Sequence, residues 1–215
     1  SAQPQPIDLD SIEATGSYSA TRTEIAHALL LRGPMKLALS GALEASPEEA
    51  SHASSPAFDA NSHIHLHLEA GNVAIGDIQP FLAQKLPLTG AIDAEIQANG
   101  PLHSLEGSGW VQLDNGSLYG EPVKRLRAQG AVSNSVVNLS SISLANEAGT
   151  VAATGSYNLN SRRFQIDAHA AAIDIAKIDQ LRRQGWSTTG KLGFICRGAG
   201  DIFAGLGAME HGARG

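Results

Sequence analysis

The sequence predicts an all-β protein, mostly an antiparallel meander of short strands, and three observations support this fold class. Apolar and polar residues alternate with a period of two through much of the 215 residues, most clearly in "AIDAEIQ" at 91–97. Turn-forming residues separate such segments, as in "ANGP" at 98–101 and "DNG" at 114–116. An internal repeat relates two parts of the chain. Parallel βαβ units are not expected, because their crossovers need a dozen or more residues between strands.

Taken in order, the chain divides into four regions. Residues 1–44 are expected to form the N-terminal strands of a partial repeat. Residues 45–62 are rich in Ala, Ser, Pro and Glu with little to bury, so a flexible loop is expected there. Residues 63–194 form the main repeat region, whose alternating segments include "GWVQLD", "KRLRAQG", "SVVNLS" and "TVAATGSY". Residues 195–215 lose this alternation, and we assign them only as an uncertain, truncated tail.

One short helix is expected to interrupt the strands at 77–86. The sequence "DIQPFLAQKL" places four apolar side chains on roughly one side, and Pro80 falls in the first turn, where a helix tolerates proline. The four apolar residues are Ile78, Phe81, Leu82 and Leu86.

The internal repeat is found by placing residue n over residue n+100 without gaps. Apolar positions and turn glycines then coincide over about forty residues. The matched pairs include Ile64 with Phe164, Leu66 with Ile166, Val73 with Ile173, Ile75 with Ile175, Ile92 with Leu192, and Gly90 with Gly190. Such a repeat indicates an elongated architecture that grows by adding units.

Charge and motifs argue against several classes of function. The formal net charge is -6 and no long segment concentrates Lys and Arg, so nucleic acid is not an expected partner. The sequence has no G-x-S-x-G elbow, H-E-x-x-H motif or P-loop, and we therefore expect no enzymatic activity and no cofactor. Cys196 is the sole cysteine, which rules out an internal disulfide. No run of about eighteen apolar residues is present to span a bilayer.

The segment "HIHLHLEA" at 63–70 raises the question of a metal site. In a strand, His63, His65 and His67 share one face and the aliphatic residues between them share the other. The repeat places three polar residues with no common metal chemistry opposite these histidines, namely Arg163, Gln165 and Asp167. We therefore interpret the histidine face as solvated and expect no metal, with a His-rich zinc-binding surface as the rival hypothesis.

The aliphatic face has two interpretations that the residue pattern leaves open. It is either the closed core of an ordinary sandwich or the lining of an open groove. Small residues on this face slightly favour a groove, because they would fill a closed core poorly. These residues are Ala94, Ala128, Ala153, Ala168 and Ala170.

From Leu88 to Leu159 the chain resembles the AsmA-like and TamB-like proteins of Gram-negative envelopes. The resemblance lies in the order of strand patterns, here Gly90–Gly100, Gly109–Gly120, Val123–Gly130 and Ala148–Leu159. With its flanks it covers about residues 60 to 195, and it includes no catalytic signature. The resemblance implies a long, taco-shaped β sheet rolled around a hydrophobic groove. It also implies a periplasmic protein that is anchored in the inner membrane through parts of a longer parent chain.

On this resemblance, the expected function is to shelter lipid acyl chains while phospholipid moves between the inner and outer membranes, which supports outer-membrane biogenesis. The expected partners are phospholipid and possible envelope or outer-membrane assembly proteins. The rival hypothesis is a structural or adhesive β-solenoid or β-sandwich without lipid cargo. The residues expected to contact lipid are Ile64, Leu66, Leu68, Val73, Ile75, Ile92, Ile96, Val111, Leu113, Leu126, Val137, Leu139, Ile142, Leu144, Val151, Phe164, Ile166, Ile173 and Ile175.

Overall fold

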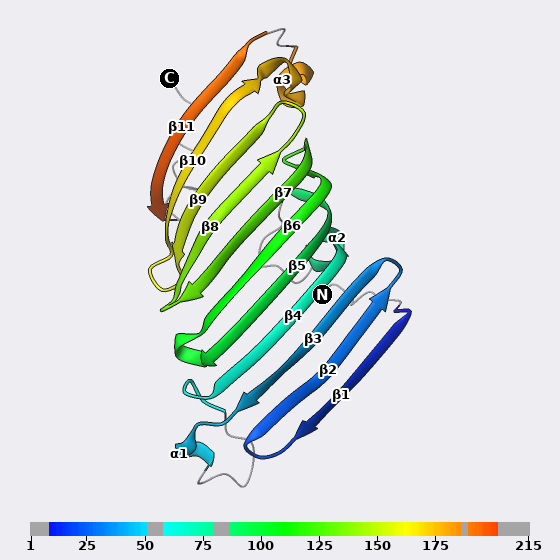
Figure 1. The fold of residues 1–215 in the computed structure, drawn as a ribbon, viewed down its shortest axis with the longest axis vertical. Helices are drawn as coiled ribbons and strands as arrows, with labels where there is room; N and C mark the ends of the chain where they lie inside the picture. The colour runs from blue at the N-terminus through cyan, green and yellow to red at the C-terminus, as the bar shows by residue number, and fades with distance from the viewer. Residues whose placement is uncertain (1–8, 51–57, 80–86, 186–188, 202–215) are drawn as a thin grey trace, which may run out of the picture.

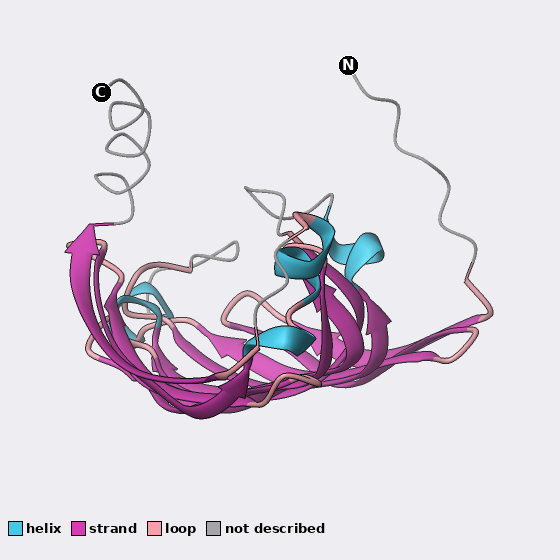
Figure 2. Ribbon diagram, turned by 90° about the horizontal axis from the view of Figure 1, so that it is seen from above, coloured by secondary structure: helices cyan, strands magenta, loops and turns pink. Residues whose placement is uncertain are grey.

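The computed structural model describes residues 9–50, 58–79, 87–185 and 189–201. These residues form one antiparallel sheet of eleven strands, and the order of strands in the sheet is their order along the chain (Figure 1). The sheet curls along its length without closing into a barrel, as Figure 2 shows. The prediction of an all-β antiparallel meander curled into a groove is confirmed.

The elements have the following bounds. The strands are β1 (Ser11–Tyr18), β2 (Arg22–Arg32), β3 (Met35–Glu44), β4 (His63–Ala74), β5 (Leu88–Pro101), β6 (Glu106–Leu118), β7 (Glu121–Ser133), β8 (Val136–Ala145), β9 (Thr150–Asn158), β10 (Arg163–Asp174) and β11 (Lys191–Asp201). The helical segments are α1 (Pro47–Ala50), α2 (Ile75–Ile78), η2 (Leu102–Ser104), η3 (Ile175–Lys177) and α3 (Asp179–Arg183).

The repeat predicted from the sequence is also a structural repeat. β4, α2 and β5 form one copy, and β10, η3 with α3, and β11 form the second. A β-bulge interrupts the register between Ala70 and Val73 in the first copy and between Ala170 and Ile173 in the second. In both copies a glycine of positive φ lies at the start of the second strand, +118° at Gly90 inside β5 and +149° at Gly190 directly before β11.

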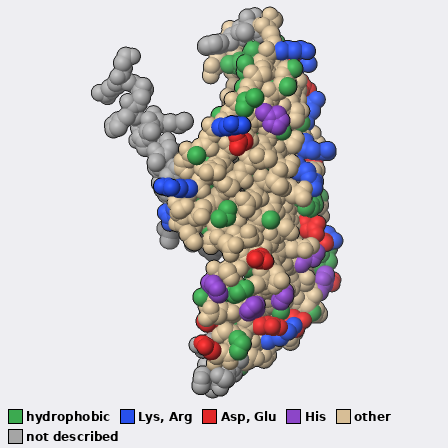
Figure 3. Space-filling view, turned by 60° about the vertical axis from the view of Figure 1, so that its left-hand side comes forward, with side chains coloured by type: hydrophobic (Ala, Val, Ile, Leu, Met, Phe, Trp, Pro, Cys, Tyr) green, Lys and Arg blue, Asp and Glu red, His purple; other side chains and the backbone are tan. Residues whose placement is uncertain are grey.

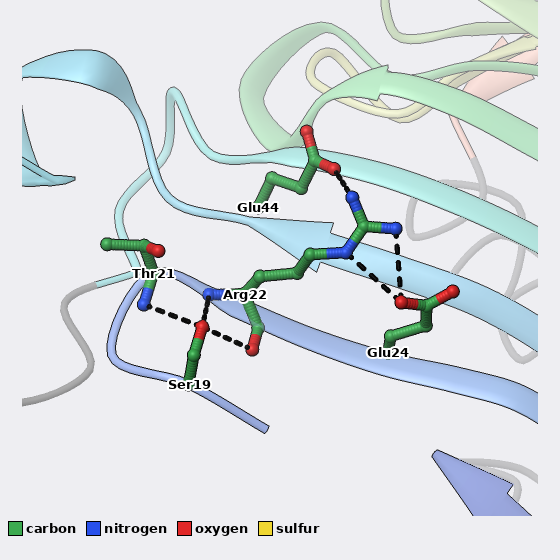
Figure 4. Close-up of polar contacts among 5 residues, drawn as sticks. All are labelled: Ser19, Thr21, Arg22, Glu24 and Glu44. Atoms are coloured by element: carbon green, nitrogen blue, oxygen red, sulfur yellow. Dashed lines mark hydrogen bonds and ion pairs between the residues drawn. The ribbon is translucent and has the colours of Figure 1, made fainter. Parts of the chain in front are cut away.

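The turn between β1 and β2 shows how polar contacts fix the ends of the strands. The Ser19 Oγ accepts hydrogen bonds from the backbone N–H groups of Thr21 (3.4 Å) and Arg22 (3.0 Å), as seen in Figure 4. The Arg22 guanidinium in turn pairs with Glu24 (3.2 Å) on its own strand and with Glu44 on β3. These contacts tie the first three strands together at one end.

The structure differs from the sequence-based expectations in the helix and at the edges of the regions. α2 begins at Ile75, two residues before the expected start, because this side chain turns inward and is 2% exposed. Residues 80–86 of the expected helix lie outside the described residues. Within 45–62, α1 is helical, and the buried Ser62 donates a hydrogen bond to Asp59 (2.9 Å). The strand β11 continues past Phe194 to Asp201. Residues 195–201 therefore belong to the sheet, and the expected boundary of the repeat region at residue 194 was too early.

Candidate functional site

Residues that lie directly opposite each other in an antiparallel sheet share a face, so the register defines which side chains line up across the strands. Three rows of this kind cross all eleven strands on one face. The first row is Ile12, Leu30, Leu37, Ala70, Ala94, Val111, Ala128, Ile142, Ala153, Ala168 and Cys196. The second is Ala14, Ala28, Leu39, Leu68, Ile96, Gly109, Gly130, Leu139, Gly155, Ile166 and Gly198. The third is Gly16, Ile25, Gly41, Leu66, Ala98, Gly107, Val132, Val137, Tyr157, Phe164 and Gly200.

These rows make a continuous hydrocarbon surface. Apart from the Tyr157 hydroxyl and the Cys196 thiol, every side chain in them is aliphatic or aromatic hydrocarbon, or the residue is glycine. Strands lie about 4.8 Å apart, so rows across eleven strands measure up to roughly 48 Å along the sheet. No charged group interrupts the surface over that distance.

This surface is open to solvent at several strands. Ile96 is 43% exposed, Val111 39% and Ile166 36%, although each points to the apolar face. Side chains of this kind in a sandwich core would be covered by a second sheet. The described residues supply one sheet, so the closed-core interpretation of the aliphatic face does not match the fold.

Glycines in the second and third rows explain the curl toward the apolar face. A Cβ atom on Gly41 would lie 2.3 Å from the His65 carbonyl oxygen, and one on Gly109 would lie 2.5 Å from that of Glu95. In each case the obstacle is the backbone of a neighbouring strand. That backbone is displaced toward the apolar face, to which the Cβ would point. Only glycine permits this close approach. We call the resulting concave apolar face the trough.

Two short helices, α2 and α3, lie along one long edge of the trough, on the inner side of the curl (Figures 1 and 2). α2 contacts β4 and β5 there, and Val73, Ile75 and Leu113 are each only 2% exposed. Farther along the sheet, Ile178 at the start of α3 packs on a buried cluster of Ala148, Ala170 and Ile173.

A carboxylate on the sheet holds α3 in this place. Glu121, at the start of β7, accepts hydrogen bonds from the backbone N–H groups of Asp179 (2.9 Å) and Gln180 (3.0 Å). The Gln180 side-chain amide donates to the carbonyl oxygen of Tyr119 (2.7 Å) in the same hairpin. α3 therefore joins the chain after β10 to the β6–β7 turn.

The structure places the predicted lipid-contacting residues in two groups. Those on the apolar face that are not fully buried are Ile64, Leu66, Leu68, Ile92, Ile96, Val111, Leu126, Val137, Leu139, Ile142, Leu144, Val151, Phe164 and Ile166. The others lie at the edge covered by α2 and α3. Val73, Leu113 and Ile173 are buried on the strands, Ile75 is buried in α2, and Ile175 is half-buried in η3.

The sequence-based list omits the trough residues of the first three strands and of β11. On β2 and β3 these include Ile25, Leu30, Leu37 and Leu39, and on β11 they are Leu192 and Phe194. The alternation of "MKLALSGALE" was a usable signal for β3.

The opposite face is polar and carries the histidines. His63, His65 and His67 alternate with the trough residues of β4, and Figure 3 shows histidines among charged side chains on this side of the molecule. The Nε2 atom of His67 lies 3.5 Å from a Glu95 oxygen and 3.8 Å from a Glu69 oxygen. In the parts of the chain that the structure describes, no three His, Cys, Asp or Glu side chains are grouped to hold a metal ion.

Trp110 organises the centre of this polar face. Its indole N–H donates to Glu95 (3.2 Å), and the Arg127 guanidinium lies 4.5 Å from the centre of its ring system. The hydrogen bond from Trp110, followed by contacts from Gln97 and His67, lowers the pKa of Glu95 from its usual range. The contacts of Glu95 with these partners are thus explained by a structural network of hydrogen bonds and ion pairs on a solvated face.

Comparison with protein-family models finds no match, and comparisons with curated proteins and with solved structures also find none. Among the described residues, no helix has the length and apolar character needed to cross a membrane. The fold and the candidate site thus define a class in physical terms, a single curled antiparallel sheet with an open apolar trough.

Proposed function

We propose that the trough shelters the acyl chains of lipids, and that the chain is a segment of a periplasmic AsmA- or TamB-like protein that moves phospholipid between the inner and outer membranes. The observation that carries the proposal is the uninterrupted set of apolar rows across eleven strands, whose central residues remain exposed. Exposed apolar surface of this extent favours a hydrophobic ligand.

The energetics suit an acyl chain. Each methylene removed from water contributes about 0.8 kcal/mol, so a tail of about sixteen carbons gains roughly 6 kcal/mol when the trough covers half of its surface. That gain is large enough to hold a tail against water. It comes from many equivalent contacts, so it does not fix the tail at one position.

The composition of the rows also supports sliding of a lipid along the trough. A polar or charged side chain among them would have to lose water as a tail passed over it, at a cost of a few kcal/mol. The alanines and glycines of the first and second rows, such as Ala94, Gly109 and Ala128, leave room for a guest. An even apolar surface therefore supports a conduit better than a binding site for one molecule.

A pair of variants tests the proposal. Ile96→Glu places a carboxylate in the exposed centre of the trough, whereas Ser108→Glu places the same charge at an exposed position on the polar face, opposite Gln97 and one strand position away across the β5–β6 ladder. We expect Ile96→Glu to weaken binding of a fluorescent long-chain phospholipid at least tenfold and Ser108→Glu to leave it unchanged. Circular dichroism and thermal unfolding check that both variants fold.

Two results would contradict lipid sheltering. One is wild-type protein that neither binds the fluorescent phospholipid nor yields lipid on organic extraction and mass spectrometry. The other is equal binding by both folded variants, which would indicate that the probe associates elsewhere. Either result favours the rival hypothesis of a structural β domain without cargo.

A further inference from the structure

The strand β11 is an open edge of the sheet. It pairs with β10 on one side, and its other side has no partner strand among the described residues. Its apolar side chains are exposed, 46% for Leu192, 37% for Phe194 and 81% for Ile195. An edge strand with these features is a template for pairing with another strand.

The direction of the strands limits which partner can extend the sheet. All neighbouring strands are antiparallel, so the first and the eleventh run in the same direction. If β11 met β1 of a second copy with both troughs on the same side, the new pair would be parallel. If β11 meets β11 of a second copy about a two-fold axis normal to the sheet, the pair is antiparallel and the two troughs remain on the same side. Antiparallel pairing is the more stable of the two per residue.

The sequence of β11 is complementary to itself in this arrangement. A two-fold axis at Cys196 places Leu192 opposite Gly200 of the second copy and Phe194 opposite Gly198. Each large apolar side chain thus faces a glycine, which brings no side chain of its own to the contact. The Phe164 ring already lies beside Gly200 and the Ile166 side chain beside Gly198, so the incoming side chain would pack against them. In β1, a two-fold axis at Ala14 would place Ile12 opposite Gly16, so β1 offers one such pair and β11 offers two.

The polar side of the strand is compatible with the same pairing. The axis places Ile195 opposite Arg197 of the second copy. The Arg197 guanidinium already pairs with Asp167 on β10 at 2.8 Å, so the two arginines near the axis each have a counter-charge within their own chain. Their mutual repulsion is reduced accordingly.

From these observations we propose that β11 is a self-pairing edge. Two copies of this chain form a two-fold dimer through antiparallel β11 strands, with Cys196 at the axis and the two troughs joined into one. The proposed interface rests on the register and composition of β11 as the last strand of the described sheet, and it does not require the trough to bind lipid.

Opposite charges introduced at Ile195 test the interface. This side chain is 81% exposed, so either charge is tolerated in a single copy. In the dimer, residue 195 of each copy faces Arg197 of the other copy. Ile195→Lys therefore creates two repulsive pairs, whereas Ile195→Glu creates two attractive pairs. Under reducing conditions, sedimentation equilibrium over a concentration series should give a dimer for the wild type, a dissociation constant raised at least tenfold for Ile195→Lys, and an unchanged or lower one for Ile195→Glu. A monomeric wild type at about 100 μM, or two variants with the same dissociation constant, overturns the proposal.

Cross-linking identifies the axis. Directly opposite residues in an antiparallel pair have Cα atoms about 4.5–5.5 Å apart, which is within the range of a disulfide. Added copper(II)–phenanthroline accepts the two electrons as two thiols lose their protons and form the bond. We expect a rapid covalent dimer from the wild type and a slow one from Ile195→Lys. Cys196→Ser should form no covalent dimer yet sediment as the wild type does. A wild-type dimer that does not cross-link would place the interface elsewhere and overturn the proposal.

Discussion

Asn72 and Ala172 occupy the same position in the two β-bulges of the structural repeat, and both have a left-handed backbone, with φ of +52° and +58°. The two sites differ in support. The Asn72 N–H donates to the Asp93 side chain (2.9 Å), whereas the residue that matches Asp93 in the second copy is Gly193. Ala172 therefore holds a conformation that alanine disfavours without this side-chain hydrogen bond.

We predict that Ala172→Gly raises the free energy of unfolding by about 0.5–1 kcal/mol, because glycine adopts positive φ without steric cost. The matched control is Ala171→Gly, at the neighbouring exposed residue of ordinary φ, which should lower it by a similar amount. Urea denaturation measures both. A destabilised Ala172→Gly would show that the alanine methyl group contributes more than the strain costs.

The sequence predicts the strands and the repeat well because both depend on local alternation. The period of two places Leu66 and Leu68 on one face of β4, and the register with β5 adds Ile96 to the same face. The bulges and the positive φ at Gly190 recur because the second copy retains the apolar positions around them.

The covered edge of the trough and the last strand were harder to predict. Leu113 is buried on β6, beside the strands β4 and β5 that α2 contacts, and long-range packing of this kind is not encoded in a strand pattern. In β11, Gly198 and Gly200 occupy apolar rows, yet glycine in a sequence suggests a turn. The depth of the curl likewise depends on close backbone approaches at glycines that sequence analysis treats as breaks.

Gly109→Ala should flatten and destabilise the trough. The new Cβ would meet the Glu95 carbonyl oxygen at 2.5 Å, so β5 and β6 must separate at this point. We expect a loss of about 1–3 kcal/mol in the free energy of unfolding, as for other overpacked positions. Gly76→Ala is the control, because a Cβ at that helical position has nothing within 4 Å. Equal stabilities of the two variants would argue against backbone approach as the cause of the curl.

Glu121→Ala should release α3 from the β6–β7 hairpin. Two backbone N–H groups lose a charged acceptor, and hydrogen bonds to charged groups contribute about 1.5–3 kcal/mol each at most. We predict a drop of about 1–3 kcal/mol in the free energy of unfolding and faster tryptic cleavage at Arg182 and Arg183 of α3. Glu147→Ala, at a carboxylate that is 72% exposed and pairs with Lys124 at 3.7 Å, should change neither. Unchanged cleavage of Glu121→Ala would show that Ile178 packing alone holds the helix.

The hydrogen bond between Trp110 and Glu95 should make the polar face sensitive to acid. Its donation lowers the pKa of Glu95, with further contributions from Gln97 and His67. A carboxylate whose pKa is lower in the folded than in the unfolded chain stabilises the fold above its unfolded value, near 4.5, and this stabilisation is lost as the pH falls through the lower folded pKa. Glu95→Gln should therefore be less stable than the wild type at pH 7, and the difference should vanish toward pH 3.

Trp110 fluorescence and urea denaturation across this pH range measure the effect directly. The control is Glu106→Gln, which removes an exposed carboxylate at the far end of the β5–β6 pair. This variant should leave the pH dependence of Trp110 fluorescence unchanged. The stability curves of wild type and Glu95→Gln must converge as the pH falls, because protonation removes the same charge that the substitution removes. Curves that stay parallel from pH 7 to 3 would mean that Glu95 has the same proton affinity in the folded and unfolded chain, and that Trp110 does not favour its ionised form.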